Sequence, residues 1–101
     1  MTEPSFRFAS SFTDDLTDAV EYYEAIGTDL ANRFRGAVET TLRTVQQRPE
    51  SFGKVDGAFR CATVEPFPYF LLFSSQPGLV RITRIVHAAS DPKTWITLPE
   101  S

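Results

Sequence analysis

The chain has 101 residues, of which 42% are hydrophobic, and its formal net charge at pH 7 is −3. This length suits a single domain, taken as residues 1–101, with enough apolar material for one core. The negative charge argues against a protein that binds mainly through nucleic-acid phosphates. No segment reaches the ~20 apolar residues of a membrane helix. A single cysteine excludes an internal disulfide.

Cofactors and compartment follow from the same composition. No Cys/His spacing is typical of a zinc site, so we expect neither a metal nor another cofactor. Cys61 lies in an apolar run and is expected to be a packed thiol. The start MTEPSFRF lacks the basic residues and apolar run of a signal peptide, which predicts a cytoplasmic protein.

The first predicted elements are a strand and a helix. The stretch SFRFASSF, residues 5–12, places Phe6 and Phe8 on one side of a period-two pattern, as in a strand. A helix is predicted from Thr13 as N-cap to Gly27 as C-cap. Its apolar face consists of Leu16, Ala19, Val20, Tyr23 and Ile26.

A second helix is predicted to follow at once, capped by Thr28 and ended by Pro49. Its apolar face consists of Leu30, Phe34, Ala37, Val38, Thr41, Leu42 and Val45. Two amphipathic helices with so short a connection form an antiparallel hairpin. Since each has one apolar face, the pair needs a sheet to cover.

Three strand-like runs supply that sheet, at residues 58–65, 69–75 and 79–87. Short connections containing Pro or Gly, PFP and QPG, join them and predict an antiparallel meander. The predicted fold class is therefore α+β, in the order β-α-α-β-β-β, with a helix hairpin packed on one face of a small antiparallel sheet.

Four segments in this order resemble the RelE/ParE superfamily of toxins from type II toxin–antitoxin modules, in particular its ParE-like branch of plasmid stabilisation proteins. They are YYEAIGTDLANRFRGAVETTL, RPESFG, FRCATVEPFPYFLLF and RIVHAASDPKTW, and they span nearly the whole chain. The resemblance implies a bacterial cytosolic toxin that is neutralised by a cognate antitoxin, whose C-terminal segment wraps the helices and sheet of the toxin.

The superfamily contains two toxic mechanisms. RelE-like members cut mRNA in the ribosomal A site, whereas ParE-like members bind DNA gyrase and trap its DNA-cleaved state. A shared fold does not decide between them, so the site residues must. RNA cleavage by attack of a 2′-hydroxyl needs a base, cations that stabilise the phosphorane and an acid for the leaving oxygen.

The basic positions of RelE-like toxins are mostly lost here. Arg60 stands at the first of them, but the second is Ala62, and the arginine of the next strand is replaced by Phe70. Ala88 and Ala89 follow the last strand where an arginine is expected, and Trp95 lies near the C-terminal tyrosine position. An indole ring exchanges no useful proton. These losses argue against an enzyme.

One catalytic hypothesis remains. Alternation along the last strand predicts Arg81 and His87 on one face, so Arg60, Arg81 and His87 are the candidates for a catalytic cluster. The competing interpretation of His87 is structural: one ring nitrogen donates to a loop carbonyl and anchors the following turn. Trp95 is then expected to pack over the edge of the sheet.

The leading hypothesis is a non-enzymatic toxin that binds a cellular enzyme, with DNA gyrase first by family resemblance. The alternatives are a ribosome-dependent mRNA endoribonuclease and a degenerate, non-toxic member. Candidates for contact with the antitoxin or the target are Arg33, Arg35, Phe70 and Trp95, since exposed arginines suit carboxylates. We also expect an apolar groove between the hairpin and the sheet, covered by the antitoxin or in a homodimer.

Overall fold

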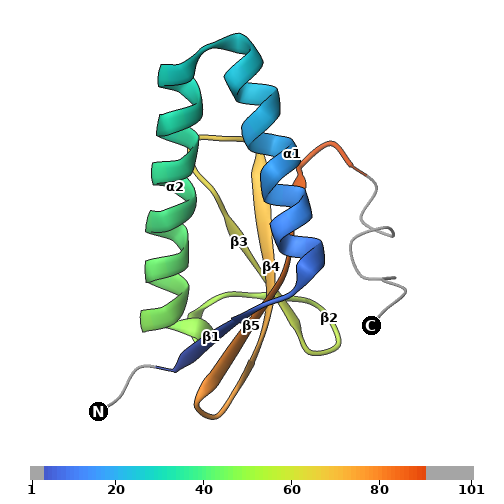
Figure 1. Ribbon diagram of the computed structural model, residues 1–101. Coiled ribbons are helices and arrows are strands. Elements are labelled where there is room, and N and C mark those ends of the chain that lie inside the picture. The colour runs from blue at the N-terminus through green and yellow to red at the C-terminus, as the bar shows by residue number, and fades with distance from the viewer. Residues whose placement is uncertain (1–3, 91–101) are drawn as a thin grey trace.

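The computed structural model describes residues 4–90, which form two long helices against a twisted sheet (Figure 1). The N-terminal strand β1 spans Ser5–Phe8 and leads directly into helix α1, Ser10–Ile26. The predicted strand over residues 5–12 is therefore too long, because Phe12 belongs to the helix and is 3% exposed in the core. Phe12 lies four residues before Leu16, so it extends the predicted apolar face by one turn.

The start of α1 also differs from the prediction. Ala9, with extended backbone angles of −72° and 152°, is the N-cap, and no side chain caps the helix. Thr13 instead lies in the first turn, where its hydroxyl donates to the carbonyl of Ser10. Thr13 is therefore not the N-cap.

Helix α2 spans Thr28–Gln47 and begins directly after Gly27. Gly27 is both the C-cap of α1, as predicted, and the N-cap of α2, so Thr28 is the first helical residue and not the cap. The helix ends before the short 3₁₀ turn Pro49–Ser51. Its core-facing residues Ala31, Phe34, Val38, Thr41 and Val45 largely match the predicted apolar face.

The sheet has five strands in the order β1-β5-β4-β3-β2. The strands after the helices are β2 Lys54–Asp56, β3 Phe59–Thr63, β4 Tyr69–Gln76 and β5 Leu79–His87. β2 to β5 form the predicted antiparallel meander, but β1 pairs in parallel with β5, so the sheet is mixed and not antiparallel. The short edge strand β2 was not predicted, because its three residues carry no apolar alternation.

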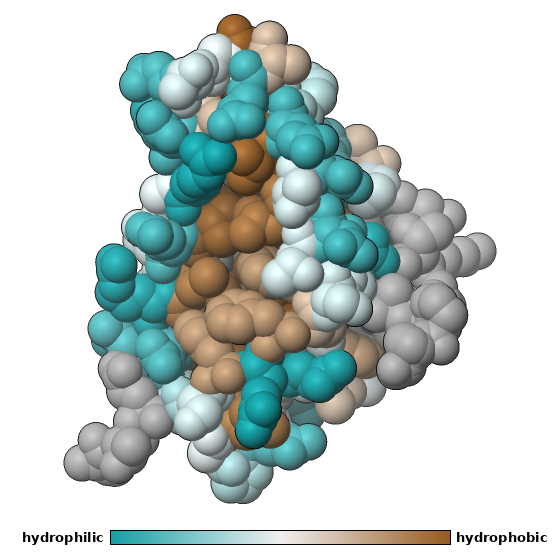
Figure 2. Space-filling view, viewed as in Figure 1, coloured by the Kyte–Doolittle hydropathy of each residue, from teal (hydrophilic) through white to brown (hydrophobic). Residues whose placement is uncertain are grey.

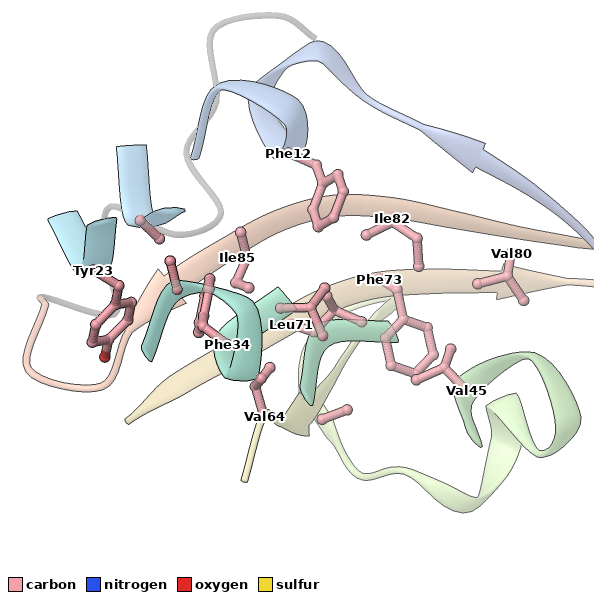
Figure 3. Packing of buried hydrophobic residues seen from close by; sticks show 14 residues of the cluster. Phe12, Tyr23, Phe34, Val45, Val64, Leu71, Phe73, Val80, Ile82 and Ile85 are labelled. Atoms are coloured by element: carbon pink, nitrogen blue, oxygen red, sulfur yellow. The ribbon is translucent and has the colours of Figure 1, made fainter. Parts of the chain in front are cut away.

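Both helices cover the same face of the sheet, as predicted (Figure 1). The core lies between these two layers, where Phe34 of α2 and Phe73 of β4 are fully buried. Figure 3 shows side chains from the helices and from the strands meeting in this layer. The opposite face carries a smaller apolar cluster around Leu72 and Val86. We call the two sides the helix face and the far face of the sheet.

Candidate functional site

His87 ends β5 and lies on the helix face. Its strand partner is Tyr69, and the two rings meet edge to face at 5.1 Å. Tyr69 in turn packs against Phe34 of α2, with ring centroids 5.2 Å apart. The imidazole Nδ1 accepts the backbone N–H of Ala89 at 3.0 Å. His87 thus helps to fix the turn after β5, with Nδ1 as the acceptor.

Arg60 also lies on the helix face, at the other end of the sheet. It pairs with Phe73 of β4, whereas His87 pairs with Tyr69, four residues away along the same strand. Four residues of strand separate the two positions by roughly 13 Å along β4 alone. The guanidinium Nη1 of Arg60 donates to the carbonyl of Phe52 at 2.6 Å. Arg60 therefore stabilises the loop before β2.

Arg81 lies on the far face, so the prediction that Arg81 and His87 share a face is wrong. The ladder between β4 and β5 shifts between Leu72 and Phe73, where β5 contains one additional residue, Thr83. Val80 and Ile82 before the shift face the helices, and so does Ile85 after it. A bulge of this kind breaks the two-residue alternation. The structure brings no two of Arg60, Arg81 and His87 together.

The positions carried over from RelE-like toxins do not share a face either. Ala62 belongs to the core under the helices, whereas Phe70 packs with the cluster on the far face. Cys61 is partly buried and packs against that same far-face cluster, as predicted for a packed thiol, and burial raises its pKa. Trp95, including its predicted packing over the sheet edge, lies outside the described residues.

An apolar depression lies between the two helices and extends to Phe8 of β1, whereas the prediction placed a groove between the hairpin and the sheet. We call it the interhelical groove; its volume is about 400 Å³. Figure 2 shows apolar residues gathered between α1 and α2, with polar residues along both rims. The apolar lining consists of Phe8, Phe12, Leu16, Val20, Val38 and Leu42. Phe12 was assigned to the predicted strand but belongs to α1, so sequence reasoning did not place it between the helices.

Arg35 of α2 reaches across to α1 at the rim of this groove. Its guanidinium lies 3.1 Å from the carboxylate of Glu24 on α1 and 2.9 Å from the side-chain oxygen of Asn32. Both charged side chains are about half exposed, so the pair contributes little to stability. Arg33 instead lines a separate depression beside Glu65. The two predicted contact residues of α2 therefore serve different surfaces.

The part of the chain that the structure describes contains no group of three or more His, Cys, Asp or Glu side chains placed to hold a metal ion. Within the same residues, no helix is long and apolar enough to cross a membrane.

Burial also raises the pKa of Tyr69, with Tyr23 and Tyr22 adding to the effect. The raised pKa leaves the phenol group of Tyr69 neutral at physiological pH.

Comparison with solved structures shows which fold the chain adopts. A chain of the chromosomal ParDE toxin–antitoxin system of P. aeruginosa superposes with a TM-score of 0.74 at 20% identity, covering 84% of this chain and 96% of the other. The E. coli DinJ-YafQ toxin–antitoxin complex gives 0.64 at 13% identity, covering 87% and 96%. YafQ of E. coli strain BL21(DE3) gives 0.58 at 16% identity, covering 86% and 96%. This is the RelE/ParE toxin fold.

Family membership rests on the sequence itself. Residues 6–92 match the family model described as the ParE toxin of the type II toxin–antitoxin system parDE. The chain therefore belongs to the ParE toxin family, as the sequence motifs predicted. A search among curated proteins gives no match.

Proposed function

We propose that this protein is the toxin of a type II toxin–antitoxin pair, acting in the cytoplasm by binding a cellular enzyme, with DNA gyrase as the first candidate. A cognate antitoxin neutralises it. The family supports the toxin and the antitoxin, and the choice of a binding mechanism is carried by one observation: the bulge at Thr83 separates Arg81 from His87 on opposite faces of the sheet.

That separation matters because RNA cleavage needs its base, its acid and its cations around one phosphate. Arg60 and His87 share a face but lie at opposite ends of it, and Arg60 is committed to the carbonyl of Phe52. A toxin that works by binding needs no such convergence. It needs an accessible surface that the antitoxin can occupy or obstruct.

The interhelical groove is the surface we assign to the antitoxin. Its floor is apolar and its rims carry Thr13, Glu39 and Arg35. An apolar floor between polar rims suits an amphipathic segment that lays its apolar face into the groove. The same surface can be covered in a homodimer when the antitoxin is absent, which is the form we propose for the isolated toxin.

The test is a cleavage assay with purified gyrase, supercoiled DNA and the purified protein, in which linear DNA is scored after denaturation. The proposal predicts that linear DNA accumulates and that the cognate antitoxin reverses the effect. No linear DNA at a large molar excess would refute the gyrase target. The antitoxin alone, without toxin, is the control.

The second candidate function is ribosome-dependent mRNA cleavage. The observation that favours it is His87, which is exposed and lies beside Tyr69. It is tested with ribosome-bound mRNA, wild-type protein and the variants Arg60→Ala, Arg81→Ala and His87→Ala. Loss of mRNA cleavage in a folded His87→Ala variant would establish this alternative. Absence of both activities would leave a degenerate member that only binds its antitoxin.

A further inference from the structure

A second cavity of about 310 Å³ lies where α1 meets the ends of β4 and β5. Its walls include Asp15, Asp18 and Tyr22 from α1, Tyr69 from β4, and Arg84 and His87 from β5. Asp18 and Tyr22 stand four residues apart in the sequence and so share a helix face. We call this cavity the tyrosine pocket.

Among the described residues, the tyrosine pocket holds one carboxylate without a partner, that of Asp18. The carboxylate of Asp15 is bound by Arg84 at 2.6 Å and by the backbone N–H of Ile85 at 3.2 Å, so these two side-chain charges cancel. Asp18 has neither an ion-pair nor a hydrogen-bond partner among the described residues. Residues 1–31 carry seven acidic side chains against one arginine, so the surrounding field is also negative.

Aromatic rings complete the walls. Tyr22 is 60% exposed and Tyr69 is partly buried, and Tyr23 packs between them, with centroid distances of 5.2 Å and 6.2 Å. The face of a tyrosine ring attracts a cation, and the planar guanidinium of arginine stacks on such faces while it binds carboxylates. A free carboxylate beside tyrosine rings is therefore the chemistry of a receptor for a guanidinium group.

The small volume of the tyrosine pocket and the charge of Asp18 argue against a nucleotide or an RNA segment as the ligand. Pockets for small molecules span roughly 300–1,000 Å³, so this one is at the small end and has room for one side chain instead of a nucleotide. The free carboxylate of Asp18 repels phosphates, which argues against an RNA segment at this position.

We propose that the tyrosine pocket binds a single arginine side chain of a partner protein. That the partner is the antitoxin or the target of the toxin rests on the proposed function, whereas the capture of the arginine does not. The pocket is distinct from the interhelical groove, since Asp18 and Tyr22 do not line that groove. A partner that fills the groove can therefore be held at a second point by this contact.

The test is an NMR titration of the full chain with blocked arginine, N-acetyl-arginine methylamide, at constant pH. The chain contains one histidine and three tyrosines, so the ring signals of His87 and Tyr69 can be followed individually. Saturable shifts of these signals are expected with blocked arginine. Blocked citrulline, which has the same shape without the charge, is expected to give none.

Two matched variants locate the site. Asp18→Asn should weaken binding about three- to fivefold, the range expected for one exposed ion pair. Asp14→Asn removes the same charge from the same helix outside the pocket and should leave the affinity within experimental error. Equal shifts with citrulline, or equal weakening in both variants, would overturn the proposal.

Discussion

The carboxylate of Asp15 in α1 lies 2.6 Å from the guanidinium Nε of Arg84 in β5, and it also accepts the backbone N–H of Ile85 at 3.2 Å. The last residue pair between β1 and β5 is Phe8 with Ile82. The contact of Asp15 lies further along β5, beyond that pair. Helix α1 thus replaces β1 as the neighbour of β5. In the same region, the hydroxyl of Ser11 donates to the carbonyl of Thr83 at 2.6 Å. Side chains of α1 therefore form hydrogen bonds with backbone groups of β5 where β1 no longer pairs with it.

The first prediction concerns this edge. Asp15→Ala should lower the free energy of unfolding by about 1–3 kcal/mol, because it leaves Arg84 and the N–H of Ile85 without their charged acceptor. Both side chains of the pair are only about one-fifth exposed, so solvent screens the interaction incompletely. Urea denaturation measures the change. Asp14→Ala, at an exposed position of the same helix, is the control and should change stability by less than about 0.5 kcal/mol.

The second prediction concerns two arginines that face each other. Arg7 of β1 and Arg81 of β5 are direct strand partners, both exposed, and neither has an ion-pair partner among the described residues. Like charges directly opposite each other destabilise a sheet by roughly 0.2–1 kcal/mol. Arg7→Glu and Arg81→Glu should therefore each raise the free energy of unfolding by roughly 0.2–1 kcal/mol.

A double-mutant cycle separates this coupling from the general effect of lowering the charge. The double variant again places like charges opposite each other, so it should be less stable than the sum of the two single changes. Thermal unfolding at low and high salt measures all four proteins, and the coupling should shrink as salt rises. Strictly additive changes would show that the two side chains do not interact.

The elements of this fold were predictable where apolar periodicity is long. Helix α2 has a continuous apolar face from Leu30 to Val45, and the strand over residues 79–87 was placed at its observed bounds. The first strand was predicted too long because SFRFASSF also fits a period of two for a few residues. Only Phe12, which continues the face of the following helix, could have shown that the helix begins earlier.

The candidate site was less predictable for a physical reason. Which residues share a face of β5 depends on the bulge at Thr83, and that bulge follows from how β4 and β5 pack, not from the local sequence of either strand. The parallel pairing of β1 with β5 is likewise a contact between distant segments. The sequence therefore predicted the layers and the family, but not the geometry that separates Arg81 from His87.

The third prediction tests the interhelical groove. Val20 lines the groove and is partly buried, whereas Val55 of β2 is 45% exposed and lies away from it. Val20→Gln should weaken antitoxin binding by about tenfold or more, since a buried amide without a partner costs about 1–3 kcal/mol. The same substitution at Val55 should leave the affinity unchanged. Calorimetric titration with the antitoxin measures both, and equal affinities would place the antitoxin elsewhere.

The fourth prediction concerns alkaline pH. Burial raises the pKa of Tyr69 above 10.0, with Tyr23 and Tyr22 adding to the effect, and burial likewise raises that of Tyr23. A group with a raised pKa in the folded state holds its proton more tightly than in the unfolded chain. Its contribution to stability is therefore complete below about pH 10 and is lost as the pH rises further.

The measurement is the free energy of unfolding in urea from about pH 9 to pH 11. It is made in a Cys61→Ala background, because burial also raises the pKa of that thiol above its ordinary value of 9.0 and adds a decline of its own. Stability should fall with increasing pH, and the additional variant Tyr69→Phe should fall less steeply because one titrating group is gone. Identical slopes with and without Tyr69 would mean that its phenol group titrates alike in the folded and unfolded chains, contrary to its packing against Phe34 and His87.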